Sequence, residues 1–191
     1  GGPTWPVIRF YHNTVLRRTP VFRDYFLFGL GAQGLRNNER DVFNNVFVQM
    51  EKVPGVGFAG IKQVGNLREG GNILWGVVDG PAASSEPFAK FRASPLFADS
   101  QRVYERGFTT DDRVVDPQFV ALTADVSQPI DLRLQPTSPA VDTGLALPTD
   151  WPDPHRANDK NQPDIGALPL GTKPWTVGID ARMPLFGPPA K

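Results

Sequence analysis

The chain has 191 residues, in which 20 lysines and arginines balance 20 aspartates and glutamates, so the net charge is zero. That balance excludes the basic excess on which nucleic-acid binding usually depends. The absence of cysteine excludes disulfides and thiolate metal sites, and 20 prolines with 19 glycines argue against long helices. Because 13 phenylalanines and 4 tryptophans are spread among these residues, the composition indicates a loop-rich globular protein.

The first 80 residues contain a repeated phrase, in which a short apolar run carries an asparagine at its centre. The phrase occurs as FYHNTVL, VFNNVFV and EGGNILW, with its asparagines about 30 residues apart. One β-type motif in a period of that length is typical of stacked coils, a solenoid. We expect Asn13, Asn45 and Asn72 to form a ladder of side-chain hydrogen bonds, unless they are three ordinary turn asparagines.

Beyond residue 80 the pattern changes. A polar break at residues 81–85 precedes irregular segments, and after residue 144 the chain is mostly loop. Helical periodicity is weak, with at most one or two turns expected over residues 86–92. We interpret residues 1–80 as coils with an asparagine ladder, 81–170 as the last coils and a C-terminal cap, and 171–191 as an extended tail of the same domain.

Four further phrases carry a resemblance to a known family. They are DPQF at 116–119, DLRL at 131–134, SPAVDTG at 138–144 and DIGA at 164–167. Together with the asparagine phrases they resemble the C-terminal part of right-handed parallel β-helix proteins, the pectate-lyase-like superfamily, which includes polysaccharide lyases and many uncharacterised secreted proteins. The resemblance covers most of residues 7–170. It departs from the family after Ala167, where Leu168-Pro169 replace an aromatic and an acidic residue.

The resemblance implies an all-β fold, a right-handed parallel β-helix (solenoid), to which this chain would contribute C-terminal coils and a loop-rich cap. Coils that begin in mid-strand would expose an open strand edge and an apolar core. We therefore expect a fragment of a longer β-helix, which joins an N-terminal β-helix segment or a partner chain. The family also implies a secreted, periplasmic or cell-surface location, and no membrane-spanning run is visible in the sequence.

Two functions stay open at this point. The first is the C-terminal portion of a secreted carbohydrate-active protein, a polysaccharide lyase or glycoside hydrolase acting on acidic polysaccharide, with catalysis mainly outside this chain. The second is a non-catalytic cell-surface or filament scaffold, or an adhesin, that stacks on a partner subunit. A stripe of arginines, lysines and carboxylates on one flank, with aromatic residues beside it, would favour the first function.

No catalytic residue can be assigned from the sequence. Lyases of the family need a base and a group that neutralises the uronate carboxylate, either Ca²⁺ or arginine. Each possible saccharide contact has an ordinary alternative as exposed surface, turn or core. These candidates are Arg9, Tyr11, His12, Arg17, Arg36, Lys52, Lys62, Arg68 and Trp75.

Structural and metal-binding roles are indicated near the end of the chain. Asp142, Arg156 and Asp164 would be buried or half-buried partners that hold the last loop against the final coil. No metal motif is present, but the acidic loops at 111–112 and 150–159 offer oxygen ligands of the type that Ca²⁺ prefers. Ordinary solvated loops explain these acidic residues better.

Overall fold

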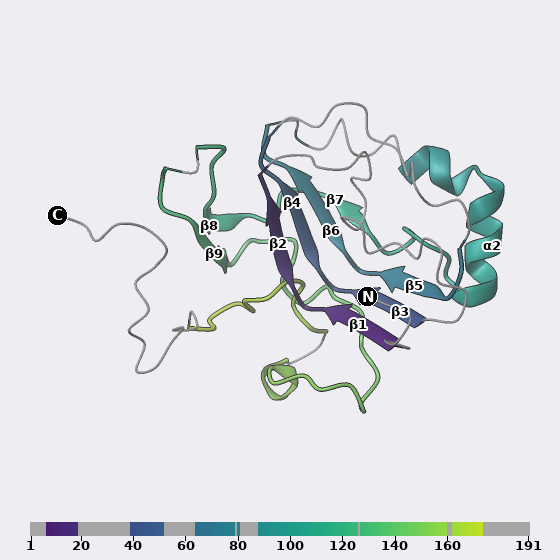
Figure 1. Ribbon diagram of the computed structural model, residues 1–191. Helices are drawn as coiled ribbons and strands as arrows, with labels where there is room; N and C mark the ends of the chain where they lie inside the picture. Colours follow the sequence, from purple (N-terminus) through teal and green to yellow (C-terminus); the bar gives the residue numbers. More distant parts are fainter. Residues whose placement is uncertain are drawn as a thin grey trace.

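The computed structural model describes residues 7–18, 39–51, 64–78, 80, 88–125, 127–159 and 162–173. Two parallel sheets of short strands form its centre (Figure 1). In the first sheet the order is β1 (Val7–Tyr11), β3 (Glu39–Phe43) and β5 (Leu67–Gly70). In the second it is β2 (Thr14–Arg17), β4 (Val46–Gln49), β6 (Ile73–Gly76) and β7 (Arg113–Val114).

A two-residue bend connects the two sheets in each repeat. Its first residue has a left-handed backbone in all three repeats: His12 at φ 50°, Asn44 at φ 53° and Gly71 at φ 68°. Asparagine and glycine tolerate this conformation better than most residues, which explains two of the three choices. The second residue of each bend is the repeated asparagine. Because all neighbouring strands pair in parallel, the three bends stack directly on one another.

Hydrogen bonds join the three asparagines. Asn13 donates from its backbone nitrogen and from Nδ2 to Oδ1 of Asn45, at 2.9 and 3.1 Å. Asn45 donates in the same way to Oδ1 of Asn72, at 3.0 and 3.0 Å. The Asn45 side chain therefore accepts two hydrogen bonds from one repeat and donates one to the next, and the ladder satisfies backbone groups that are buried inside the bends.

Two apolar clusters lie on opposite faces of the second sheet. Alternate residues of a strand point to opposite faces, so Phe47 and Leu74 face the first sheet, while Val46, Val48 and Ile73 face the other way. Helix α2 (Pro95–Val103) contributes Leu96, Phe97 and Val103 to the cluster between the sheets. Strands β8 (Phe119–Ala121) and β9 (Asp131–Leu134) cover the opposite face with Phe119 and Leu134.

The predicted fold class, an all-β right-handed parallel β-helix, is wrong. Within the described residues the sheets are open, and they combine with helix α2 in an α/β-like arrangement. The helix was missed because proline was counted against helices, whereas Pro95 stands at the helix start, where a fixed φ is favourable and no N–H is needed. Strand β9 matches the phrase at 131–134, but it pairs antiparallel with β8 and so forms a hairpin instead of a last coil.

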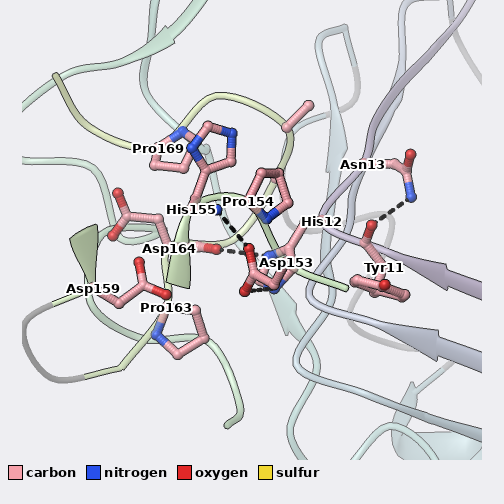
Figure 2. Close-up of a pocket in the computed structure, with 12 residues that line it drawn as sticks. Tyr11, His12, Asn13, Asp153, Pro154, His155, Asp159, Pro163, Asp164 and Pro169 are labelled. Atoms are coloured by element: carbon pink, nitrogen blue, oxygen red, sulfur yellow. Dashed lines mark hydrogen bonds and ion pairs between the residues drawn. The ribbon is translucent and has the colours of Figure 1, made fainter. Parts of the chain in front are cut away.

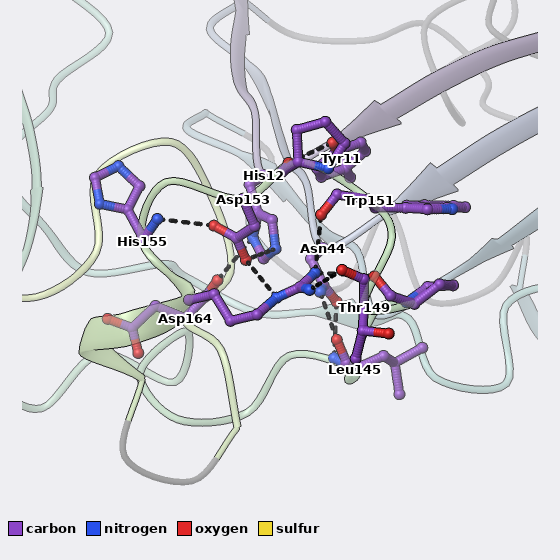
Figure 3. Close-up of polar contacts among 12 residues, drawn as sticks. Tyr11, His12, Asn44, Leu145, Thr149, Trp151, Asp153, His155 and Asp164 are labelled. Atoms are coloured by element: carbon purple, nitrogen blue, oxygen red, sulfur yellow. Dashed lines mark hydrogen bonds and ion pairs between the residues drawn. The ribbon is translucent and has the colours of Figure 1, made fainter.

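The segment from residue 144 to residue 170 lies across the stacked bends. Among the described residues of this segment, the regular element is the short 3₁₀ helix η2 (Arg156–Asn158). Nδ2 of Asn44 donates to the Leu145 carbonyl and its Oδ1 accepts from the Leu145 nitrogen, both at 2.8 Å (Figure 3). At the far end of the segment, the Gly166 nitrogen donates to the Asn44 carbonyl at 2.9 Å. The left-handed bend residue Asn44 thus holds both ends of this segment.

The described part of the chain contains no helix that is both long and apolar enough to cross a membrane.

Candidate functional site

An ion-paired stripe crosses the outer face of the first sheet. Arg9, Asp41 and Arg68 are register neighbours on β1, β3 and β5. Nε of Arg68 donates to Oδ1 of Asp41 at 2.7 Å, and Nε of Arg9 lies 3.8 Å from Oδ2. The Asp41 side chain is fully buried, whereas the Arg9 and Arg68 side chains are 40% and 44% exposed. Two cations share one carboxylate, so the stripe carries a net charge of about +1.

Aromatic side chains lie beside this stripe. The Trp151 ring is 5.2 Å from the Tyr11 ring and 6.1 Å from the Phe43 ring, between ring centroids. Tyr104 meets Phe43 edge to face at 5.7 Å. The guanidinium of Arg9 lies 4.9 Å above Trp151, within cation–π distance. Residues from two strands, from the end of α2 and from the segment 144–170 therefore form one aromatic cluster.

A cavity of about 310 Å³ opens between the stripe and the aromatic cluster. Its size is at the lower end of the range for small-ligand sites, about 300–1,000 Å³. Apolar and aromatic side chains form most of the wall, and two arginines provide cationic groups, a combination that is typical of binding sites. The lining residues are Phe43, Arg68, Tyr104, Arg106, Leu145, Ala146, Leu147, Pro148 and Trp151.

The polar groups of this cavity have defined protonation states. The hydrogen bond from Arg68 to Asp41 raises the pKa of Arg68, so this guanidinium stays charged. Burial, helped by the neighbouring Asp111, raises the pKa of Tyr104 to about 12, so its hydroxyl keeps its proton at physiological pH. Arg106 donates from Nε to Oδ2 of Asp111 at 2.5 Å, and its side chain is 58% exposed. The cavity therefore offers hydrogen-bond donors and a small excess of positive charge.

Arg156 fixes the wall that the segment 144–170 contributes. Its NH1 donates to the Thr149 carbonyl at 2.7 Å, and its NH2 donates to the carbonyls of Pro148 and Trp151 at 2.9 and 3.1 Å. One planar guanidinium thereby satisfies three carbonyls of the turn that carries Trp151. The Tyr11 hydroxyl donates to the Pro152 carbonyl next to this turn at 2.5 Å. The aromatic wall is therefore held from both sides.

A second cavity, of about 250 Å³, is lined by residues of the first bend and of the same segment (Figure 2). His12 projects from the first bend toward Asp153 and Asp164. Its Nδ1 is 3.2 Å from the Asp164 carbonyl, which fixes this nitrogen as the donor and leaves Nε2 as the acceptor. Nε2 is 3.8 Å from Oδ2 of Asp153, and it is buried. His12 therefore fastens the segment to the bend through Nδ1, while its ring lines the cavity.

Burial lowers the pKa of His12, although the charge of Asp153 acts in the opposite direction. The imidazole is therefore mainly neutral at neutral pH. In the same cavity, burial and then the nearby charges of Asp153 and Asp164 raise the pKa of Asp159. Within the described residues no group of three histidine, aspartate or glutamate side chains has a metal-binding arrangement. Calcium at the acidic loops stays a prediction.

The structure brings together three of the candidate saccharide contacts on the outer face of the first sheet, namely Arg9, Tyr11 and Arg68. His12 lies behind them in the second cavity. The other described candidates, Arg17 and Trp75, are on β2 and β6 of the second sheet. Three candidates lie outside the described residues: Arg36, Lys52 and Lys62.

The residues expected to hold the last loop do so in different ways. Asp164 accepts from the nitrogens of Asp142 and Leu170, both at 2.7 Å. Asp142 is exposed and contributes its backbone N–H instead of its carboxylate. Arg156 binds backbone carbonyls, and its nearest carboxylate is Asp153, with 3.9 Å between Nε and Oδ2. Only Asp164 uses its carboxylate as the sequence suggested.

Sequence reasoning missed most of the cavity wall. Asp41 and Phe43 follow directly from the repeat, because they occupy in β3 the positions of Arg9 and Tyr11 in β1. Aligning the phrases position by position would have found them. Tyr104, Arg106 and Trp151 come from irregular segments, where no periodicity shows which side chain meets the sheet.

No protein-family model, no curated protein and no solved structure matches the chain. The resemblance to the pectate-lyase-like superfamily therefore stays a prediction, and the site must be interpreted from its own chemistry.

Proposed function

We propose that this chain binds an acidic saccharide in the cavity between the arginine stripe and the aromatic cluster. In this proposal it is the saccharide-binding part of a secreted carbohydrate-active protein, a polysaccharide lyase or glycoside hydrolase, whose catalytic groups lie mainly outside the chain. The observation that carries the proposal is the placement of Arg68 and Arg106 at a cavity of about 310 Å³ whose other walls are largely aromatic and apolar.

The charge of the site favours an anionic ligand of low charge. Arg9 and Arg68 share the single carboxylate of Asp41, while Arg106 is neutralised by Asp111. The remaining charge of about +1 matches one carboxylate at a time. A guanidinium has five N–H donors, and Arg68 uses Nε on Asp41, so its terminal nitrogens suit bidentate binding of a second carboxylate. The neutral chain lacks the wide basic surface that a nucleic acid needs.

The uncharged walls favour a sugar ring as the carrier of that carboxylate. A pyranose has apolar C–H faces and a rim of hydroxyls, so it suits a cavity with both kinds of wall. Leu147 and Pro148 line the apolar side together with the edge of the aromatic cluster. The Tyr104 hydroxyl lies 3.4 Å from Oδ2 of Asp111, and both groups can exchange hydrogen bonds with sugar hydroxyls. Trp151 is 4% exposed and therefore supports the wall instead of serving as an open stacking platform.

Isothermal titration calorimetry with oligosaccharides of equal length tests the proposal. We expect oligogalacturonate or alginate oligomers to bind, and neutral galactan or glucan oligomers to bind much more weakly. Arg68→Met should weaken binding roughly tenfold or more, since hydrogen bonds to charged groups contribute about 1.5–3 kcal/mol. Tyr104→Phe removes only one hydroxyl and should leave the fold intact while it weakens binding less.

Arg102→Met and Arg133→Met are matched controls, because both arginines are exposed and neither lines the cavity. Equal affinity for neutral and acidic oligomers, or an Arg68→Met variant that binds like the controls, would contradict the proposal. If no saccharide binds at all, the non-catalytic scaffold becomes the better hypothesis.

A further inference from the structure

Asp112 occupies the position of a fourth asparagine in the ladder. Its Oδ1 accepts from the backbone nitrogen and from Nδ2 of Asn72, at 2.7 and 3.1 Å. This is the same pair of contacts that Asn72 accepts from Asn45, and that Asn45 accepts from Asn13. Asp112 also directly precedes strand β7, which pairs with β6. The ladder therefore ends in a carboxyl group, which can accept hydrogen bonds but donates one only when it is protonated.

A second buried carboxyl group lies against this last position. The Glu69 side chain is fully buried on the inner side of β5. Its Oε1 accepts from the Thr109 nitrogen at 2.5 Å, and its Oε2 accepts from Nδ2 of Asn72 at 3.3 Å. Oδ2 of Asp112 is buried, and no N–H or O–H group of the described residues donates to it. Both carboxyl groups accept from the same Nδ2 of Asn72, so they are neighbours, and a proton shared between them would supply a donor.

The electrostatics agree with one shared proton. Burial raises the pKa of Glu69 well above its ordinary value, and the charge of Asp112 and the hydrogen bond to it add to this effect. Burial also raises the pKa of Asp112, whereas its hydrogen bond from Glu69 acts in the opposite direction. These directions place the proton on Glu69, which then donates it to ionised Asp112.

The same two carboxyl groups hold the segment that forms one wall of the cavity. The chain leaves α2 at Tyr104 and reaches β7 through residues 105–112, which include Arg106. Glu69 fixes the Thr109 backbone of this segment, and Asp112 fixes its end to Asn72. Thr109 has a left-handed backbone at φ 65°, an unfavourable conformation that its contacts must maintain.

We propose that Glu69 and Asp112 act as a proton-dependent fastening for residues 104–112, so that release of their shared proton loosens the cavity wall and weakens ligand binding. The binding half of this inference rests on the proposed saccharide site. Two neighbouring ionised carboxylates inside the protein would repel each other, and the proton that joins them would be lost. The wall is therefore expected to be ordered below the pH at which Glu69 releases its proton and to loosen above it.

The surrounding charged groups leave this pair isolated from compensating cations. Asp111 and Tyr104 on the same segment act on it, and Asp111 raises the pKa of Asp112 further. Arg92, before α2, donates to Oγ1 of Thr109 at 3.0 Å instead of to either carboxyl group. From the neighbouring strands, Arg40 donates to the Glu39 carbonyl and Arg113 donates to Oγ1 of Thr143. Among the described residues no arginine therefore neutralises a second negative charge at this place.

Hydrogen exchange tests the fastening without any ligand. We expect the protection factors of the Thr109 and Asp112 amides, corrected for intrinsic exchange, to fall as the pH rises through the range in which the Glu69 carboxyl ¹³C signal titrates, and that range should lie above the ordinary one for glutamate. The key variant is Asp112→Asn, since an asparagine can accept from Asn72 like the other ladder positions and donate to ionised Glu69. In this variant the protection of the two amides should no longer depend on pH, and the Glu69 titration should move toward its ordinary range.

Glu69→Gln is a second variant that supplies a donor to Asp112, and Asp99→Asn, on the exposed side of α2, is the matched control. Protection that falls equally in wild type and Asp112→Asn, or that does not change with pH in wild type, would overturn the fastening. The affinity for an acidic oligosaccharide should fall over the same pH range in wild type and stay constant in Asp112→Asn. An absence of saccharide binding at every pH would refute the proposed function and leave the exchange result to decide the fastening.

Discussion

Asn45 donates to Asn72 from two nitrogens at once, its backbone nitrogen at 3.0 Å and its Nδ2 at 3.0 Å. One buried oxygen, Oδ1 of Asn72, accepts both hydrogen bonds. The side chain of Asn72 therefore satisfies donors of the preceding bend in addition to the hydrogen bonds of its own bend. Because water cannot reach this oxygen, nothing replaces it when the side chain is removed.

Asn72→Ala is expected to lower the free energy of unfolding by about 3–5 kcal/mol, because it leaves several buried donors and acceptors unpaired and each costs about 1–3 kcal/mol. Urea unfolding measures the loss. Asn66 provides the control, since its side chain is exposed in the turn before β5, and Asn66→Ala should stay within about 0.5 kcal/mol of wild type. Equal losses in the two variants would show that the ladder adds nothing to stability.

The arginine stripe predicts that replacing its two arginines lowers the free energy of unfolding more than replacing its aspartate. Asp41 is fully buried, so Arg9→Met with Arg68→Met leaves an uncompensated buried carboxylate and should cost about 3–5 kcal/mol. Asp41→Asn should cost only about 1 kcal/mol, because both arginines are partly exposed and can turn to water. Chemical denaturation of the three proteins compares these values. A larger loss in Asp41→Asn than in the double variant would contradict this account.

His12 predicts a loss of stability in acid. Burial lowers the pKa of folded His12 below that of the unfolded chain, about 6.5, so the unfolded chain takes up the proton first as the pH falls. The stability that neutral His12 provides is therefore complete above about pH 6.5 and is lost as the pH falls toward the folded value. The groups that face the ring are Asp153, Asp164, His155 and Arg156.

The matched variant is His12→Asn, because asparagine also tolerates the left-handed backbone and does not titrate. Thermal melts should show a Tm difference between wild type and variant that is constant above about pH 7 and shrinks toward pH 5. A difference that is independent of pH would mean that His12 carries the same proton in the folded and unfolded states.

The repeat was visible in the sequence because its chemistry is local. An apolar alternation with asparagine at its centre located the three bends and the residues that link them. Tyr11 lies within these phrases, Arg9 and Arg68 directly precede two of them, and register places all three on one face. Lys52 lies outside the described residues, so its prediction is open.

The rest depended on contacts between distant segments, which no local pattern encodes. Trp151 meets Tyr11 across 140 positions of sequence, and only the path of the segment 144–170 brings them together. The acidic pair at 111–112 attracted attention only as a source of oxygen ligands, whereas Asp111 binds Arg106 and Asp112 continues the ladder. The phrase DDRVV at 111–115 does resemble NNVFV at 44–48, and this similarity would have indicated that Asp112 takes the position of a ladder asparagine.

The lack of a side chain at Gly71 allows the segment 144–170 to lie close to the bends. A Cβ at Gly71 would lie 2.5 Å from Oδ1 of Asn44 and 3.0 Å from Cγ of Leu145. Gly71→Ala is therefore expected to displace Leu145 and open the cavity wall. It should lower the free energy of unfolding by several kcal/mol, about 1–2 of them from the left-handed backbone at φ 68°.

Gly171 is the control that separates the steric cause from the backbone cause, because it has φ 78° but nothing within 4 Å of its Cβ position. Gly171→Ala should show the backbone cost alone, and thermal melts with calorimetric titration of an acidic oligosaccharide would compare the two variants. If Gly71→Ala unfolds and binds like Gly171→Ala, the segment does not need the close contact at Asn44 that holds the cavity wall in place.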